Sequence, residues 1–299
     1  MEAKSGVYLD GEEVKKQSIL QYLMNQKHPF ELIHTKMCKN ILGVHRKASD
    51  IMSKAELGRF PLMSNIVKNC FNYWQHILKA DSSTLLSSMY TSLFSNTAKI
   101  RDNYFSRFNA LMCCLEKEYL PSKPLKNPHK EAKDIQQKMN NLYIDHFFNI
   151  LHTKAERTNS GGRFEIYRKV KFNYKFENYL HLDNKLRRHI TSIRISTHNL
   201  PIEALRRHSV ERKNRICNCC NNKDIGSEKH VLMYCNNTEI TSQRNLLFEK
   251  IFTICTQWKS LSTDDKFLYL LLAHDHAINF YFAVFLEKIY RIVNEHKTK

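Results

Sequence analysis

Three cysteines and one histidine constrain this chain more than any other feature of its sequence. Cys217, Cys220, His230 and Cys235 follow the spacing Cys-x2-Cys-x9-His-x4-Cys. A gap of two residues lets both sulfurs of one turn point into the same tetrahedron, and three thiolates with one imidazole make a closed structural zinc site. Zinc binding contributes about 10–16 kcal/mol in small modules, more than such a polar loop gains by burying apolar groups. We therefore predict a structural Zn²⁺ that folds this segment and does no catalysis.

Two alternatives to that zinc site remain open from the sequence. The first is that the cysteines are reduced and bind no metal, since a chain with an odd total of nine cysteines contains no evenly spaced disulfide framework; we favour the zinc site over it. Cys219 is a second candidate ligand in place of Cys217 or Cys220, although its one-residue gap to Cys217 fits a metal poorly.

The positive charge of the chain is concentrated directly before the cysteines. Lysine and arginine total 47 against 29 acids, a formal charge of +18, which favours a polyanionic partner, either nucleic acid or an anionic membrane surface. Residues 185–215 contain nine of these bases against Glu203 and Glu211. Because guanidinium groups match phosphate oxygens, we predict an RNA or DNA backbone partner, the alternative being a solvated basic face. The predicted phosphate contacts are Arg187, Arg188, Arg194, Arg206, Arg207, Arg212 and Arg215.

The composition predicts a mainly α-helical fold. Seven glycines and six prolines are few, and 42% of the residues are hydrophobic. We expect a bundle-like N-terminal part, a linker, and then helices flanking a small zinc knuckle. The predicted segments are a variable tail at 1–30, a helical region at 31–120, a proline-containing linker with a helix and a glycine loop at 121–163, the basic zinc-knuckle region at 164–240, and a C-terminal helical region at 241–299.

Apolar spacing predicts where several helices lie and which side they bury. One stripe contains Leu32, Ile33, Met37 and Ile41; a second contains Ile66, Cys70, Tyr73, Trp74 and Ile77; a third, in a helix at 130–152, contains Ile135, Met139, Leu142, Phe147 and Ile150.

Two acidic sites predict helix starts. Asp183 is predicted to cap a helix with Leu186, Ile190 and Ile193 inward and with its basic residues, Arg194 included, outward. Asp264-Asp265 suits a helix N-terminus, where acids complement the dipole.

The alternating bases and aromatics of residues 171–176 leave two interpretations. A strand would place Phe172, Tyr174 and Phe176 on one face as a stacking platform for bases. A helix would instead bury Tyr167, Val170 and Tyr174 in a core, and we favour this second interpretation.

Nothing in the sequence favours a membrane-spanning segment or an oxidising compartment. The first residues are polar and do not resemble a secretory signal. The longest apolar stretch, residues 267–286, is interrupted by His274, Asp275, His276 and Asn279, which are costly at bilayer depth. We expect that stretch to be a buried helix, and the protein to be intracellular, in the nucleus, the cytoplasm or both.

Several of these segments together resemble the region that follows the polymerase in non-LTR retrotransposon reverse transcriptases. The similar residues are 167–180, 186–187, 193–200, 202–203, 215–217 and 228–235, the last being Glu-Lys-His-Val-Leu-Met-Tyr-Cys. A second similarity, to the segment after the thumb, covers residues 38–44, 46–49 and 55–62. The resemblance implies zinc held by Cys217, Cys220, His230 and Cys235 and binding of RNA or DNA. A polymerase on a separate chain is a candidate partner that the sequence leaves open.

The same comparison of motifs argues against catalysis by this chain. The aromatic-x-Asp-Asp sequence of a polymerase palm is not found, so we expect a non-enzymatic nucleic-acid-binding protein. Two alternatives remain. One is a restriction-like endonuclease fragment using Asp264, Lys266 and Glu249; the other is an interaction module in which helices at 248–258 and 267–293 bind a partner rather than form a core.

Overall fold

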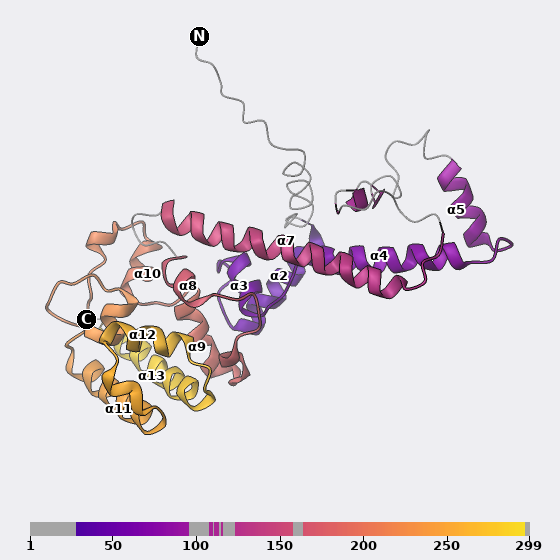
Figure 1. Ribbon diagram of the computed structural model, residues 1–299. Coiled ribbons are helices and arrows are strands. Elements are labelled where there is room, and N and C mark those ends of the chain that lie inside the picture. The colour runs from indigo at the N-terminus through magenta and orange to yellow at the C-terminus, as the bar shows by residue number, and fades with distance from the viewer. Residues whose placement is uncertain are drawn as a thin grey trace, which may run out of the picture. The chain divides into compact units, whose positions relative to one another are not determined.

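Helices make up the regular secondary structure of the described residues, which confirms the mainly α prediction. Figure 1 shows the computed structural model, which describes residues 28–95, 108–109, 111–113, 115, 123–157 and 164–296. Within these ranges the only β pairing consists of isolated antiparallel bridges, Leu57 with Phe176 and Ile216 with Ile225. The predicted tail up to residue 27, the end of the predicted helical region at 116–120, the start of the predicted linker at 121–122 and the glycine loop at 158–163 lie outside the described residues.

The chain forms two compact units, and their membership cuts across the segments expected from the sequence. Unit 1 contains Met1–Leu32 and Phe60–Phe148, and unit 2 contains Ile33–Arg59 and Asn149–Lys299. Residues 33–59 therefore belong to the same unit as the four predicted metal ligands, although the helices at 62–95 that follow them in sequence belong to the other unit.

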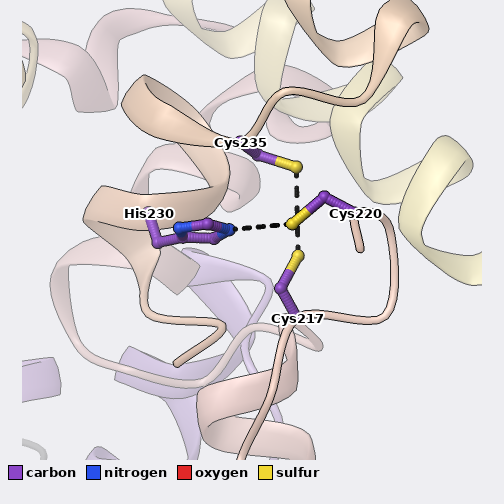
Figure 2. Close-up of side chains that lie close together, drawn as sticks. All are labelled: Cys217, Cys220, His230 and Cys235. Atoms are coloured by element: carbon purple, nitrogen blue, oxygen red, sulfur yellow. Dashed lines mark hydrogen bonds between the residues drawn. The ribbon is translucent and has the colours of Figure 1, made fainter. Parts of the chain in front are cut away.

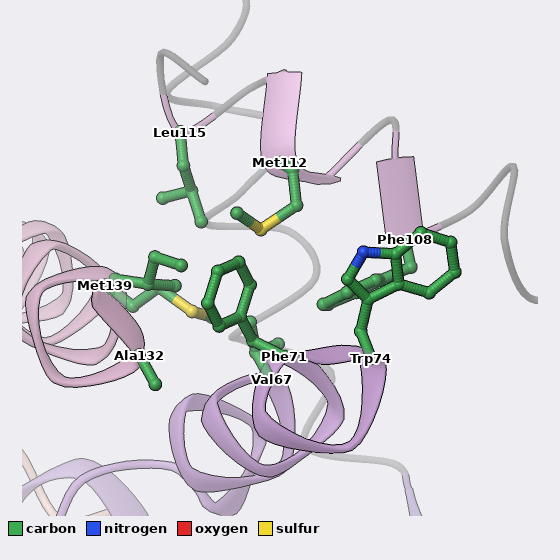
Figure 3. Close-up of a cluster of buried hydrophobic side chains, with 9 residues drawn as sticks. Val67, Phe71, Trp74, Phe108, Met112, Leu115, Ala132 and Met139 are labelled. Atoms are coloured by element: carbon green, nitrogen blue, oxygen red, sulfur yellow. The ribbon is translucent and has the colours of Figure 1, made fainter. Parts of the chain in front are cut away.

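Unit 1 is built on helices α4 (Leu62–Lys79), α5 (Leu85–Ser95) and most of α7 (Pro128–Arg157). Its apolar core, shown in Figure 3, joins one face of α4 to the first turns of α7 and to three side chains from residues 108–115. The core residues are Val67, Phe71, Trp74, Phe108, Met112, Leu115, Ala132, Ile135 and Met139. The Gln75 side chain also accepts a hydrogen bond from the Leu125 N–H at 2.8 Å, which ties the described end of the linker to α4.

The buried faces of the first two helices differ from the predicted ones. On α2 (Pro29–Leu42), Leu32, Ile33, Met37 and Ile41 are 43–57% exposed, while Cys38 and Leu42 are buried. On α4, Ile66 and Tyr73 are exposed and the neighbouring residues Val67 and Phe71 are buried instead, although Trp74 and Ile77 are buried as expected. Adjacent positions point about 100° apart on a helix. Because both helices carry apolar residues on more than one face, apolar spacing alone could not show which face is buried.

Unit 2 is organised around α13 (His276–Glu295), which packs against α11 (Thr238–Ile254), α9 (Asn184–Arg194) and α12 (Thr263–Leu272). Shorter elements surround them: α3 (Asp50–Glu56), α8 (Phe164–Val170), η1 (Asn178–His181), α10 (Pro201–Arg206), η2 (Arg212–Asn214), η3 (His230–Tyr234) and η4 (Thr256–Ser260). The predicted caps are confirmed. The Asp183 side chain accepts from the N–H groups of Lys185 and Leu186, and Asp264 and Asp265 lie in the first turn of α12, whose N-cap is Ser262.

The apolar stretch at 267–286 is two helices and not the single helix we expected. α12 ends at Leu272, and α13 begins after Asp275, whose side chain accepts from the Ile278 N–H at 3.0 Å. The two axes meet at 109°. Among the described residues no single helix has the length and hydropathy to cross a bilayer, whereas the bent pair α12 and α13 meets both criteria taken together.

A buried group of charged side chains connects distant parts of unit 2. Arg194, only 1% exposed, donates through Nε to Glu56 Oε2 at 2.9 Å and through Nη1 to the Leu271 carbonyl at 2.6 Å. Lys171, also buried, pairs with Glu177, and the Tyr179 hydroxyl donates to Glu56. The prediction that Arg194 faces outward and contacts phosphate is therefore wrong, because its guanidinium compensates a buried carboxylate instead.

Candidate metal centre and basic segment

A small hairpin positions the first two cysteines. The Cys217 N–H donates to the Asp224 carbonyl at 2.8 Å, and the Gly226 N–H donates to the Arg215 carbonyl at 2.8 Å. Cys220 lies in the turn between these two stretches, and Lys223 closes the turn with a left-handed backbone (φ 55°). The hairpin therefore brings the ligands of the Cys-x2-Cys pair to one end of the loop.

A π-helical turn, η3, positions the histidine and the last cysteine. The Cys235 N–H donates to the His230 carbonyl at 2.7 Å, so a hydrogen bond joins residues that are five apart. Five residues make about 1.4 turns of an α-helix, which would direct the two side chains to different sides. The wider π turn, with its i to i+5 bonding, suits a His-x4-Cys pair that must face one point.

These two elements bring the four predicted side chains together (Figure 2). Their ligand atoms all lie within 4.8 Å of one another. Cys217 Sγ is 3.9 Å from Cys235 Sγ, and Cys220 Sγ is 3.4 Å from His230 Nε2. A tetrahedral ion with bonds of about 2.3 Å to sulfur and 2.0–2.1 Å to nitrogen requires S–S edges of about 3.8 Å and S–N edges of about 3.6 Å. The arrangement can hold a metal ion without rearrangement of the backbone.

The electrostatics of the thiols favour a cation between them. Hydrogen bonds from Cys219 and Cys235 lower the pKa of Cys217, whereas the hydrogen bond with Cys217 raises the pKa of Cys235. One sulfur thus becomes a thiolate at the expense of its neighbour. A divalent ion removes that competition, because all three thiolates then gain a positive partner.

Cys219 is not one of the four ligands. Its sulfur lies 3.7 Å from Asn218 Oδ1, and its backbone carbonyl accepts from Asn237 Nδ2 at 3.1 Å. The four side chains whose ligand atoms lie within 4.8 Å of one another do not include Cys219. The structure therefore gives no support to Cys219 as a ligand in place of Cys217 or Cys220.

Several supporting residues of the site were not predicted from the sequence. Arg244, buried on α11, donates to the Leu232 carbonyl at 2.8 Å and to the Cys235 carbonyl at 2.7 Å, which fixes the middle and the C-terminal end of the π turn. Asp224 Oδ2 lies 3.6 Å from His230 Nδ1, the ring nitrogen that faces away from Cys220. Metal-bound histidines commonly direct their second nitrogen toward a carboxylate, and this partner is visible only in the folded hairpin.

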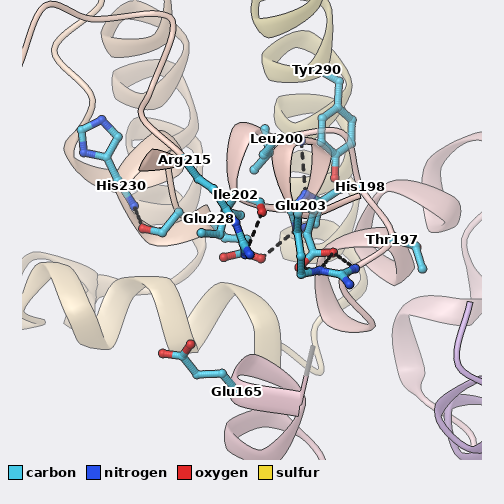
Figure 4. Close-up of polar contacts among 12 residues, drawn as sticks. Glu165, Thr197, His198, Leu200, Ile202, Glu203, Arg215, Glu228, His230 and Tyr290 are labelled. Atoms are coloured by element: carbon cyan, nitrogen blue, oxygen red, sulfur yellow. Dashed lines mark hydrogen bonds and ion pairs between the residues drawn. The ribbon is translucent and has the colours of Figure 1, made fainter. Parts of the chain in front are cut away.

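A buried histidine and carboxylate tie the metal loop to the preceding segment (Figure 4). His198 Nδ1 accepts from the Leu200 N–H at 3.2 Å, so its Nε2–H donates to Glu228 Oε1 at 2.8 Å. Burial acts to raise the pKa of Glu228, but hydrogen bonding, chiefly from His198, outweighs it and lowers that pKa. The loop before α10 is therefore held against the turn that carries His230.

The predicted phosphate contacts fall into three groups. Arg188 and Arg207 are exposed, Arg194 is buried as described above, and the other four are half-buried with partners of their own. Arg206 forms an ion pair with Glu203 and Arg212 with Glu165. Among the described residues, three others of the set donate to neutral oxygens. Arg187 donates to the carbonyls of Ile41 and Leu180. Arg207 donates to the Asn199 amide oxygen and to the carbonyls of Thr197 and His198, and Arg215 donates to the carbonyls of Val210 and Ile202.

Three of these arginines lie close enough to repel one another. Burial lowers the pKa of Arg215, and repulsion from Arg206 is the next contribution, to which Arg212 adds. Glu203 offsets part of this repulsion. An anionic ligand at this point gains more than one guanidinium partner.

The aromatic segment at 171–176 forms neither a strand nor a continuation of a helix. α8 ends at Val170, and Tyr167 and Val170 are buried as the helical-core interpretation required. Phe172 and Phe176 are 63% and 44% exposed, and the Tyr174 hydroxyl donates to the Arg59 carbonyl at 2.6 Å. The strand interpretation is therefore wrong.

The residues of the endonuclease alternative have separate structural partners. Asp264 accepts from Lys229 Nζ at 2.8 Å and from the Tyr234 hydroxyl at 2.6 Å. Asp265 accepts from the Ser262 hydroxyl at 2.6 Å, and Lys266 Nζ lies over the Phe248 and Trp258 rings. Asp264 thereby connects α12 to Lys229, which precedes the π turn, and to Tyr234, the last residue of that turn. The helices of the interaction-module alternative, α11 and α13, pack on each other within unit 2.

Comparisons with protein-family models, with curated proteins and with solved structures find no match. The geometry of the site itself therefore carries the argument that follows.

Proposed function

We propose that this protein binds single- or double-stranded nucleic acid through its phosphate backbone, using a basic segment at 185–215 that a structural Zn²⁺ holds in place. Cys217, Cys220, His230 and Cys235 hold the zinc, and no ligand position is left for water or substrate. The protein is in this proposal a binding protein and not an enzyme. The order and spacing of its motifs support derivation from the post-polymerase region of a non-LTR retrotransposon reverse transcriptase.

The observation that carries the proposal is the direct backbone connection between the metal loop and the arginines. The Gly226 N–H bonds to the Arg215 carbonyl, and the Ile202 N–H bonds to the Gly226 carbonyl at 3.0 Å. A Cβ on Gly226 would lie 2.6 Å from Pro201 Cβ, so only glycine permits this contact between the loop and the start of α10. Zinc that closes the loop therefore also fixes α10, which carries Arg206, and the neighbouring Arg207 and Arg215.

The chemistry of the exposed groups matches phosphate better than other anions. Arginine donates to two phosphate oxygens at once, and its charge displaces condensed counterions from the strand. Neutral partners leave the charge of Arg187 and Arg207 uncompensated by a carboxylate. Such contacts are independent of base identity, so we expect sequence-tolerant binding with a steep dependence on salt.

The test compares two neighbouring cysteines. Cys220→Ser removes a ligand, and Cys219→Ser changes the adjacent sulfur outside the ligand set. Zinc content, the fluorescence of Trp258 in a Trp74→Phe background as a measure of folding, and the anisotropy of a labelled oligonucleotide are measured for each. We expect Cys220→Ser to lose zinc and to weaken binding by about tenfold or more, while Cys219→Ser retains both. Loss of zinc with unchanged oligonucleotide affinity overturns the proposed coupling.

A charge variant keeps the proposal testable where Cys220→Ser fails to fold. Arg188→Gln is an exposed change that leaves the metal loop intact. Each lost phosphate contact lowers the slope of log affinity against log salt by about 0.7–0.9. Lys250→Gln, an equal change of charge on the exposed side of α11, is the matched control. Equal slopes for the two variants contradict a role for the basic segment.

A further inference from the structure

A second site in unit 2 is a cavity of about 520 Å³ that gathers basic and hydroxyl side chains from segments about 150 residues apart in sequence. It is lined by His45, Lys47, Ala48, Ser196, Thr197, Arg206 and Arg207. The turn after α2 supplies the first three, the loop after α9 supplies the two hydroxyls, and the end of α10 supplies the arginines. No carboxylate lines it, which distinguishes it from the cavity beside α12, where Glu165, Glu228 and Asp264 offset the bases.

Contacts within the protein orient His45 and both arginines of this cavity, Arg206 through its ion pair with Glu203. The Lys47 N–H donates to His45 Nδ1 at 3.1 Å, so the neutral imidazole carries its proton on Nε2 and is a hydrogen-bond donor there. Lys39 donates to the Arg46 carbonyl at 2.7 Å and anchors this turn. Arg207 is held by three hydrogen bonds to neutral oxygens, so its positive charge remains available to a ligand.

The hydroxyl side of the cavity contains two costly features. Thr197 Oγ1 is buried and has no hydrogen-bond partner among the described residues. Ser196 has a left-handed backbone (φ 53°), which L-residues rarely adopt. Buried polar atoms without partners and backbone strain of this kind concentrate at ligand sites, where a ligand supplies the missing bond.

We propose that this cavity, called here the phosphate pocket, binds the phosphate group of a nucleotide. Arginine, lysine and an imidazole N–H with a threonine hydroxyl are donors that together match the oxygens of a phosphate ester. The volume exceeds the needs of phosphate alone and lies in the range of pockets that hold a small molecule, about 300–1,000 Å³. The nucleotide is either free or part of a strand. If the phosphate belongs to a nucleic-acid strand, the inference rests on the proposed function. If it belongs to a free nucleotide, the inference is independent of that function.

The decisive variant is Thr197→Val, which keeps shape and charge and removes only the hydroxyl. A hydroxyl without a partner among the described residues contributes no bond there, so its removal should leave thermal stability unchanged or raise it. We expect Thr197→Val to weaken binding of adenosine monophosphate and of inorganic phosphate, measured by calorimetry, by about threefold or more. Lys47→Gln should weaken both by about tenfold, whereas Lys250→Gln should not. Polyglutamate, an anion without phosphate, should not compete.

The same variants are then tested with a labelled single-stranded oligonucleotide, so that the two proposals fail separately. Weaker strand binding by Thr197→Val and Lys47→Gln, but not by Lys250→Gln, assigns the pocket to a phosphate of the strand. Phosphate and nucleotide binding without any strand binding retains the pocket and overturns the proposed function. Strand binding that all three variants leave unchanged, with no measurable affinity for phosphate or nucleotide, overturns the pocket and leaves the proposed function standing.

Discussion

Replacing Arg194 by methionine removes a charge that bonds directly to both oxygens of Glu56. Nε donates to Oε2 at 2.9 Å and Nη2 to Oε1 at 3.1 Å, and Glu56 is fully buried. The substitution also leaves the Leu271 carbonyl without its donor. Breaking a buried ion pair by removal of one partner costs about 3–5 kcal/mol, because the remaining charge is uncompensated. We expect a loss of that size in the free energy of unfolding of unit 2.

The assay is urea unfolding followed by the fluorescence of Trp258 at neutral pH. The chain has two tryptophans, and Trp74→Phe in every variant leaves Trp258 of unit 2 as the single reporter. With a slope of about 2 kcal/mol per molar urea, the midpoint should fall by about 2 M. The double variant Glu56→Met with Arg194→Met removes both charges and should lose less than Arg194→Met alone. A loss below about 1 kcal/mol in the single variant refutes the electrostatic argument.

Three further predictions concern the fold around the site. Burial acts to raise the pKa of Glu56, but the positive charges of Arg194 and Lys171 outweigh it and lower that pKa. The ionised Glu56 therefore stabilises the fold at pH values above its unfolded pKa of about 4.3. This stabilisation is lost as the pH falls through the lower pKa of the folded state. The difference in unfolding free energy between the wild type and Glu56→Gln should be constant from about pH 5 to 8 and shrink below about pH 4; a difference that grows on acidification contradicts the sign. Gly58→Ala should cost about 2 kcal/mol or more in thermal unfolding, because φ is +58° and a Cβ would lie 2.7 Å from the Phe176 backbone nitrogen; a neutral result means that the bridge at Leu57 is not formed. Asp183→Ala should cost about 1 kcal/mol through loss of two N-cap bonds, and Asp183→Asn should restore most of it.

Local chemistry explains which features could be predicted from the sequence. The ligand spacing predicts the four metal-site residues because a turn and a short helix position them within 19 residues of chain. Asp183 and the Asp264-Asp265 pair were correctly assigned to helix starts for the same reason, since a cap bonds only to the next few N–H groups.

Features that depend on distant residues were not predictable. Arg194 belongs to a run of bases, and nothing near it indicates burial; its partner Glu56 lies 138 residues earlier. Arg244 supports the π turn from a helix that carries no metal ligand. The break at 273–275 had a local sign, because His274-Asp275-His276 contains a residue that caps α13, but its polarity was interpreted only as evidence against a membrane span.

The central claim is that zinc is bound by three sulfurs and one imidazole nitrogen. X-ray absorption at the zinc edge of the metal-loaded protein tests it directly, with one zinc per chain measured by native mass spectrometry. We predict about three sulfurs at about 2.3 Å and one nitrogen at about 2.0–2.1 Å, and loss of the ion in Cys220→Ser. A protein that retains no zinc, or a zinc shell made of oxygen and nitrogen without sulfur, contradicts the claim.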